Sequence, residues 1–203
     1  MNRLGKRKLE GEWYGPGSGS GSGSGAERSP VAWLSDERYA RLPAAHRALA
    51  WAAQAVGERE SGRNRGPFVE HVQELAGLGS GGGFAWCACF VYWACRRAGV
   101  EAGRLPPRGE CAAVRRWVEW AGRHGCLVRS PRRGDLFFWL EESGQGHIGF
   151  VLGSPLLGIF ATIEGNTDAG EGSREGDGVY RRTRALRGLA KMHRFGFIRL
   201  EEL

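Results

Sequence analysis

The first half of the chain has the apolar spacing of helices. Residues 42–56 are rich in alanine, carry Pro43 near the start, and repeat their apolar positions at helical intervals. The same kind of spacing predicts three further helices, at residues 68–75, 86–98 and 110–124. The helix at 86–98 is apolar on nearly every side, which indicates that it is buried.

After Gly134 the pattern changes to short apolar runs separated by glycine and polar residues. These runs predict strands at residues 135–140, 147–152, 159–164, 180–184 and 195–200. Residues 156–158 are expected to form the turn between the second and third of these strands. Helices followed by an antiparallel sheet make an α+β fold the prediction.

The N-terminal region divides into segments of different composition. Residues 17–25 alternate strictly between glycine and serine, which is typical of an engineered linker. Residues 1–16 have a basic half, an acidic half and the aromatic pair Trp13-Tyr14. We therefore predict a fused peptide at 1–16, derived from a partner or substrate and able to bind the domain, followed by the linker and a domain at 26–203. An expression leader is the alternative interpretation of the peptide.

Composition and charge restrict the classes of function. The chain has 203 residues, a formal net charge of +7 and five cysteines. Its arginines are dispersed in pairs and no nucleic-acid motif accompanies them, so we expect an anionic partner such as a cell-wall polymer and no nucleic acid. The cysteines have neither the spacing of a disulfide framework nor that of a zinc site. Without a signal peptide or an apolar run of membrane-spanning length, synthesis in the cytoplasm is expected, with delivery to the cell wall or periplasm as a phage lysin or secreted effector.

Two residues about sixty positions apart have the chemistry of a cysteine hydrolase. Cys87 lies where a glycine-rich loop gives way to a predicted helix, and the positive end of the helix dipole favours a thiolate there. His147 begins an apolar strand between glycines, and it could accept the thiol proton as a general base. Cys89 lies about 200° around the same helix and would face away from the site. The alternatives are a buried structural cysteine and a structural histidine.

Four motifs resemble those of the CHAP amidase/peptidase family, which belongs with the NlpC-type papain-like cysteine hydrolases. They are Trp-Cys-Ala-x-Phe-Val at 86–91, Gly-Asp-Leu-Phe-Phe at 134–138, Gly-His-Ile-Gly-Phe-Val at 146–151 and Ile-Glu-Gly-Asn-Thr at 163–167. The segment at 57–66 also resembles the stretch that precedes the cysteine helix in such domains. The resemblance covers about residues 44–200 and implies a papain-like core, with the nucleophile helix packed on a small antiparallel sheet.

The resemblance also implies roles for individual residues. Glu164 is the expected third member of the catalytic group, and Asn166 is the second candidate for it; an exposed strand end with a turn is the structural alternative for both. The backbone N–H of Cys87 is expected in the oxyanion hole. Substrate contacts are expected from four residues close to the nucleophile or in the upstream segment: Phe84, Trp86, Asn64 and Arg65. Asp135 is expected to form a turn at a strand start.

The function implied by this resemblance is a cysteine amidase or peptidase that works through a thioester acyl-enzyme. The expected substrate is peptidoglycan, and neither a cofactor nor a metal is expected, because no cluster of Asp residues resembles a calcium loop. One alternative is a protease that recognises a protein or peptide partner represented by residues 1–16. Another is a non-catalytic peptide-binding module on the same scaffold.

Overall fold

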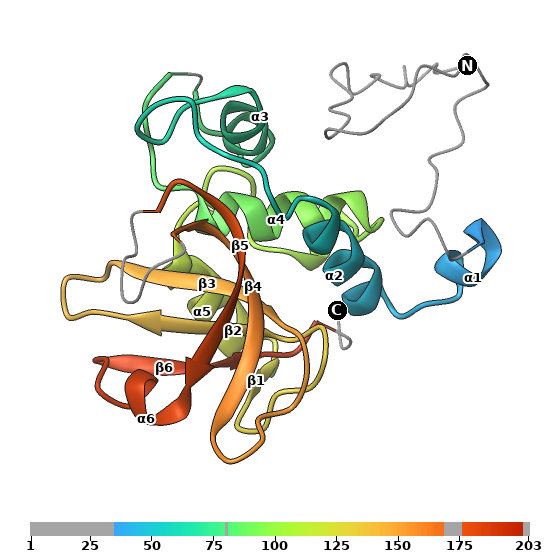
Figure 1. Ribbon diagram of the computed structural model, residues 1–203, viewed down its shortest axis with the longest axis vertical. Helices are drawn as coiled ribbons and strands as arrows, with labels where there is room; N and C mark the ends of the chain where they lie inside the picture. The colour runs from blue at the N-terminus through green and yellow to red at the C-terminus, as the bar shows by residue number, and fades with distance from the viewer. Residues whose placement is uncertain (1–34, 80, 169–175, 201–203) are drawn as a thin grey trace.

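A computed structural model of the chain describes residues 35–79, 81–168 and 176–200 (Figure 1). The predicted peptide at 1–16 and the predicted linker at 17–25 lie outside the described residues. The remaining elements are those of an α+β fold, as predicted.

The helices occupy the first part of the chain, apart from one short helix near its end. They are α1 (Asp36–Ala40), α2 (Ala44–Gln54), α3 (Pro67–Leu75), α4 (Cys87–Arg97), the 3-10 helix η1 (Ala102–Arg104), α5 (Val114–Arg123) and α6 (Leu186–Leu189). The four predicted helices are present. The last of them begins at Val114 and not near residue 110, because Ala113 has an extended backbone and residues 110–113 form turns.

The strands form one antiparallel sheet. They are β1 (Leu127–Val128), β2 (Leu136–Leu140), β3 (Gly146–Val151), β4 (Ile159–Thr167), β5 (Gly178–Ala185) and β6 (Arg194–Ile198), in the order β1-β6-β2-β3-β4-β5. All five predicted strands are present. The two residues of β1 pair with β6 but are too few to show an alternating pattern in the sequence.

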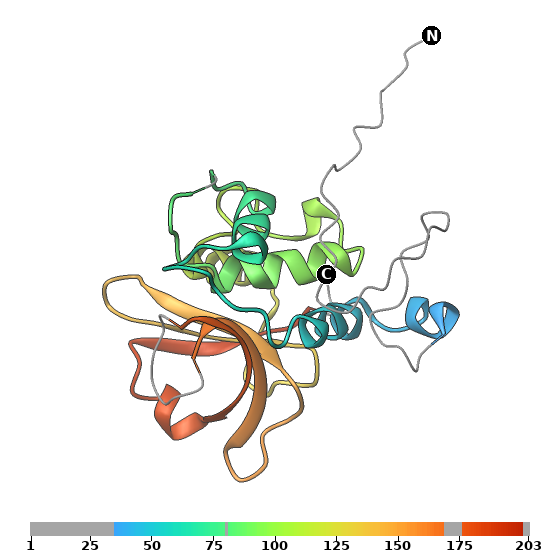
Figure 2. The same cartoon turned by 45° about the horizontal axis from the view of Figure 1, so that its top comes forward.

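One face of the sheet packs against α2, α3 and α4, which lie together in Figures 1 and 2, whereas α6 contributes Leu189 to the cluster on the other face. Side chains from β2, β3 and β4 alternate between this face and the opposite one, as the two-residue period of a strand requires. Phe90 of α4 meets Phe150 of β3 edge to face, with ring centroids 6.3 Å apart. The nucleophile helix predicted from the sequence is therefore the helix that lies against the centre of the sheet.

The other face of the sheet is curved around a second apolar cluster. The rings of Phe160 in β4 and Phe197 in β6 lie 5.7 Å apart, although β2 and β3 separate these two strands in the sheet. Such a contact requires the sheet to curl so that distant strands face one another. The cluster contains six buried residues: Phe137, Trp139, Val151, Phe160, Leu189 and Phe197.

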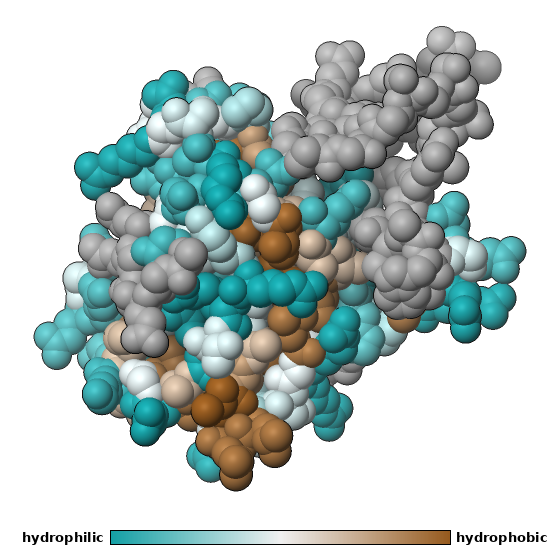
Figure 3. All heavy atoms as spheres, in the orientation of Figure 1, coloured by the Kyte–Doolittle hydropathy of each residue, from teal (hydrophilic) through white to brown (hydrophobic). Residues whose placement is uncertain are grey.

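An exposed apolar patch lies at the end of the β3–β4 hairpin. Leu156 and Leu157 are 77% and 95% exposed there, and the hairpin end is brown in Figure 3. Among the helices that the structure describes, none combines the length and apolar character needed to cross a bilayer.

Candidate active site

Cys87 is the first residue of α4. The residue before it, Trp86, has a non-helical backbone and offers no side-chain cap, so the first N–H groups of the helix have no side-chain partner from the cap position. The side chain of Cys87 is 4% exposed. The thiol therefore lies at the positive end of the helix dipole, in the place expected from the sequence.

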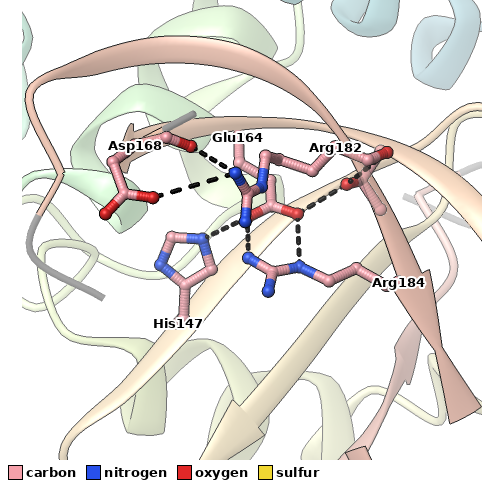
Figure 4. A network of polar contacts seen from close by, with 6 residues as sticks. His147, Glu164, Asp168, Arg182 and Arg184 are labelled. Carbon is pink, nitrogen blue, oxygen red and sulfur yellow. Dashed lines mark hydrogen bonds and ion pairs between the residues drawn. The ribbon is translucent and has the colours of Figure 1, made fainter. Parts of the chain in front are cut away.

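His147 and Glu164 point toward one another (Figure 4), and His147 shares its face of the sheet with Phe137 and Trp139. His147 comes from β3 and Glu164 from β4, and Nε2 of the imidazole lies 2.8 Å from Oε2 of the carboxylate. Both side chains are buried. Of the two candidates for the third catalytic position, Glu164 is the one that binds the histidine in this structure.

The second ring nitrogen of His147 is left for the thiol. Within the described parts of the chain, no residue other than the nearby Cys87 acts on Nδ1. Burial alone would lower the pKa of His147, but Cys87 and Glu164 are close enough to outweigh burial and raise it to about 9. The imidazole thus lies between a thiol and a carboxylate, which is the arrangement of a nucleophile, a base and an orienting group.

Glu164 is bound by more groups than the sequence indicated. Arg184 of β5 donates from Nε to Oε1 at 2.8 Å and from Nη2 to Oε2, and Thr162 donates its hydroxyl to Oε1 at 2.5 Å. Burial of Glu164 favours its neutral form, but Arg184 and His147 outweigh burial and lower the pKa of the carboxyl to about 2. Sequence reasoning missed Arg184 and Thr162.

Gly149 provides the space that Glu164 occupies. A Cβ at this position would lie 2.8 Å from Cγ of Glu164, 2.9 Å from the carbonyl oxygen of Ile163 and 2.9 Å from Phe137. No side chain larger than hydrogen fits there without moving the strand or the carboxylate. The second glycine of the Gly-His-Ile-Gly motif is therefore part of the geometry of the site.

Asn166 follows Glu164 by two residues and lies within an irregularity in the pairing of β4 with β5. Its backbone is left-handed, with φ of 55°, and its side chain is fully buried. Among the residues that the structure describes, neither atom of its amide has a hydrogen-bond partner. Asn166 is thus near Glu164 in the chain, but it does not share the hydrogen bonds of His147.

The expected substrate-contact residues lie on two loops that are joined to each other. Glu60 accepts hydrogen bonds from the indole Nε1 of Trp86 and from the backbone N–H of Asn64, both at 2.7 Å. Arg65 donates to the carbonyl oxygen of Gly81 at 2.9 Å. The upstream segment is therefore fixed against the loop that leads into Cys87.

These four residues differ in exposure. Phe84 is 47% exposed, and the side chain of Arg65 is 49% exposed. Trp86 is fully buried and Asn64 nearly so. In this structure Phe84 and Arg65 have surface to offer a substrate, whereas Trp86 bonds across to Glu60 of the other loop and Asn64 bonds to Glu60 within its own loop. Sequence reasoning also missed Glu60, which connects them.

The other cysteines have the surroundings of structural residues. All five cysteines are free thiols. Burial raises the pKa of Cys89 strongly, that of Cys95 to about 12 and that of Cys111 to about 11. Such thiols remain protonated and unreactive near neutral pH.

Asp135 accepts a hydrogen bond from the backbone N–H of Arg132 at 2.8 Å, which is the turn expected from the sequence.

The comparison with protein families agrees with the geometry. Residues 79–166 match the family model of the CHAP domain. This segment of the chain is therefore similar to a CHAP domain. The matched range contains Cys87, His147, Glu164 and Asn166, whereas Asn64 and Arg65 precede it. Searches among curated proteins and among solved structures gave no significant match.

CHAP domains are generally hydrolases of the amidase and peptidase classes, often acting on peptidoglycan, and the α+β architecture here is compatible with their papain-like core. Among the residues that the structure describes, no group of three or more His, Cys, Asp or Glu side chains is arranged to hold a metal ion.

Proposed function

We propose that this CHAP domain is a cysteine amidase or peptidase with Cys87 as nucleophile, His147 as general base and acid, and Glu164 as the group that orients His147. The observation that carries the proposal is the asymmetric use of the imidazole. Nε2 is bound to the buried Glu164 at 2.8 Å, and on the other side of the ring Nδ1 has the Cys87 thiol as its neighbour and no other described partner. A histidine with one nitrogen fixed and the other free is ready to exchange a proton with a nearby thiol.

The reaction proceeds in two halves. Cys87 transfers its proton to Nδ1 of His147, and the thiolate sulfur forms a bond to the substrate carbonyl carbon. The C–N bond then breaks as Nδ1–H protonates the leaving amine, which leaves a thioester on Cys87. In the second half a water molecule gives a proton to Nδ1 and attacks the thioester, and the thiol leaves with that proton.

The oxyanion that forms during both halves needs hydrogen-bond donors. The backbone N–H of Cys87 is one, because it lies at the uncapped start of α4. Asn166 is a candidate for a second polar contact, since its buried amide has no partner among the described residues. Its strand lies beside the start of α4: a Cβ on Gly165 would come within 2.8 Å of Trp86.

Peptidoglycan is the proposed substrate, cut at a peptide bond of the stem or at the sugar–peptide amide. The net charge of +7 suits an anionic wall polymer. The exposed Phe84 and Arg65 are the proposed contacts with it. We propose delivery to the cell wall or periplasm, where this substrate is found.

The test is the release of new amines from purified peptidoglycan. We expect wild-type protein and Cys89→Ala to release them, and Cys87→Ala to release none. Cys89 is the matched control because it lies two residues further along the same helix. Equal release by wild type and Cys87→Ala would exclude the proposed chemistry.

A protein or peptide substrate represented by residues 1–16 is the second candidate. The sequence feature that favours it is the strict Gly/Ser alternation of residues 17–25, since a tether of this kind holds a ligand near a binding site. The free peptide would be added to a domain that begins at residue 26, with binding and cleavage both measured. Cleavage that depends on Cys87 favours a protease, binding without cleavage favours a binding module, and no interaction at millimolar peptide removes this candidate.

A further inference from the structure

The carboxylate of Glu164 has all of its hydrogen-bonding positions filled. Oε1 accepts from Thr162 and from Nε of Arg184, and Oε2 accepts from Nε2 of His147 and from Nη2 of Arg184. Two oxygens with two lone pairs each accept four hydrogen bonds at most. The arrangement around Glu164 is therefore complete, and Arg184 supplies half of it.

Arg184 reaches Glu164 from the neighbouring strand. β4 and β5 pair so that Phe160 lies opposite Arg184, which places the guanidinium on the face of the sheet that carries His147. Its two contacts are those of a bidentate arginine–carboxylate pair, in which two nitrogens of the planar guanidinium donate to the two carboxylate oxygens. The orientation of the carboxylate is thus fixed from the side opposite the imidazole, as Figure 4 shows.

A buried carboxylate needs this compensation. Glu164 is fully buried, and an isolated charge in such a place either takes up a proton or moves toward water. Either event would remove the acceptor that holds Nε2–H of His147. Nδ1 of the imidazole would then lose its fixed direction toward Cys87.

From this geometry we propose that Arg184 is a positioning residue that keeps Glu164 ionised and aimed at His147. The proposal rests on the proposed function, because its catalytic consequence requires His147 to act on Cys87. Arg184 does not touch the reacting atoms. Thr162 adds the remaining contact but brings no charge.

The charged and titratable groups around Glu164 are few and can be separated experimentally. His147 faces it from β3 and Arg184 from β5, while Cys87 of α4 lies beyond His147. Asp168, the residue after β4, acts on Arg184. Burial raises the pKa of Glu164 and Arg184 is the largest opposing influence, so removal of Arg184 should raise that pKa.

The first test measures catalysis over a range of pH. We expect Arg184→Gln to lower kcat about a hundredfold. The reason is that a misplacement of about 1 Å in a catalytic group, here His147, can cost that much in rate. Its activity should also decline on the acid side at a pH about one to three units above the wild-type decline. Arg184→Lys restores the charge with a single contact, and should restore the acid limb without the full kcat. Arg181→Gln is the matched control, because Arg181 is exposed and lies on the same strand.

The second test needs no substrate and separates this proposal from the proposed function. In the Cys87→Ala background, the Glu164 carboxyl would be titrated by carbon NMR with and without Arg184→Gln. A rise in the pKa of Glu164 by about one to three units supports the proposal. An unchanged pKa in Arg184→Gln, or an equal change in Arg181→Gln, overturns it. If Cys87→Ala hydrolyses substrate like wild type, the proposed function fails while this titration still decides the role of Arg184.

Discussion

His147 uses its two ring nitrogens for different partners, and this division determines its chemistry. The carboxylate on Nε2 stabilises the imidazolium, which in the proposed mechanism is the form that protonates the leaving amine. Burial opposes that form, so the pKa of about 9 depends on the neighbours of His147 and not on its exposure. At the residue scale, the catalytic properties of His147 should therefore change when Glu164 changes.

We predict that Glu164→Gln moves the alkaline limb of kcat/KM to lower pH by about one to three units. The amide can keep the contact with Nε2, but it lacks the negative charge that raises the pKa of His147. The measurement is a pH–rate profile, with Glu119→Gln as the control because that carboxylate is exposed and paired with Arg116. An alkaline limb that stays in place would show that Glu164 does not control His147.

A second prediction at this scale concerns Gly149. Gly149→Ala should lower the free energy of unfolding by about 1–3 kcal/mol, because the added Cβ meets a strand carbonyl and the Glu164 side chain. Activity should fall with it, since the carboxylate must shift. Gly153→Ala is the control, because nothing lies within 4 Å of a Cβ at that position. Urea unfolding of both variants decides: equal stabilities would contradict the steric explanation.

At the scale of elements, the site depends on how closely α4 approaches β4. Gly165 lies between Glu164 and Asn166, and a Cβ there would come within 2.8 Å of both Phe90 and Trp86 of the α4 region. The absence of a side chain allows the helix to lie directly on the strand. Cys87 begins the same helix, so the contact of Gly165 with the helix sets the position of the thiol relative to His147.

Gly165→Ala is therefore expected to move the helix as a unit. We predict a loss of about 1–3 kcal/mol in the free energy of unfolding, together with a lower kcat, because rigid packing transmits the displacement to Cys87. Gly188→Ala, in α6 with no atom within 4 Å of its Cβ, should leave stability unchanged or raise it slightly. Thermal unfolding and amine release would be measured on both. Full activity of Gly165→Ala would show that the helix position tolerates the change.

At the scale of the whole molecule, the site links catalysis to the pH dependence of stability. The pKa of Glu164 is lowered in the folded state, so its contribution is present above pH 4.5 and is lost as the pH falls toward about 2. The pKa of His147 is raised, so its contribution is complete below pH 6.5 and is lost as the pH rises through about 9. Together the two residues stabilise the fold most between these limits.

We predict that His147→Gln removes part of the alkaline loss of stability. One proton held by the folded state corresponds to about 1.4 kcal/mol per pH unit, so the slope of the unfolding free energy between pH 7 and 9 should become less steep by up to about that amount. Buried thiols also ionise on unfolding and leave a remaining slope in both proteins. Urea titrations across this range provide the measurement. Identical slopes for wild type and variant would mean that His147 does not hold an extra proton in the fold.

Much of this site could be predicted because its signals are local. Cys87 lies at a loop-to-helix boundary and His147 lies beside glycines at a strand start, and both patterns span only a few residues. The four main helices and five of the strands follow from periods of 3.6 and two residues. Thr162 could also have been found, since it precedes Glu164 by two residues and so shares its face of the strand.

The sequence by itself determined the order of the elements, the α+β class and the candidates for nucleophile and base, because backbone periodicity and helix-terminus chemistry depend on neighbours in the chain. Only the tertiary structure decided that Glu164 binds His147, that Arg184 grips Glu164, and that Trp86 is buried against Glu60. These three contacts join residues 17, 20 and 26 positions apart in the chain. Their formation depends on strand register, sheet curvature and loop packing, which no local pattern specifies.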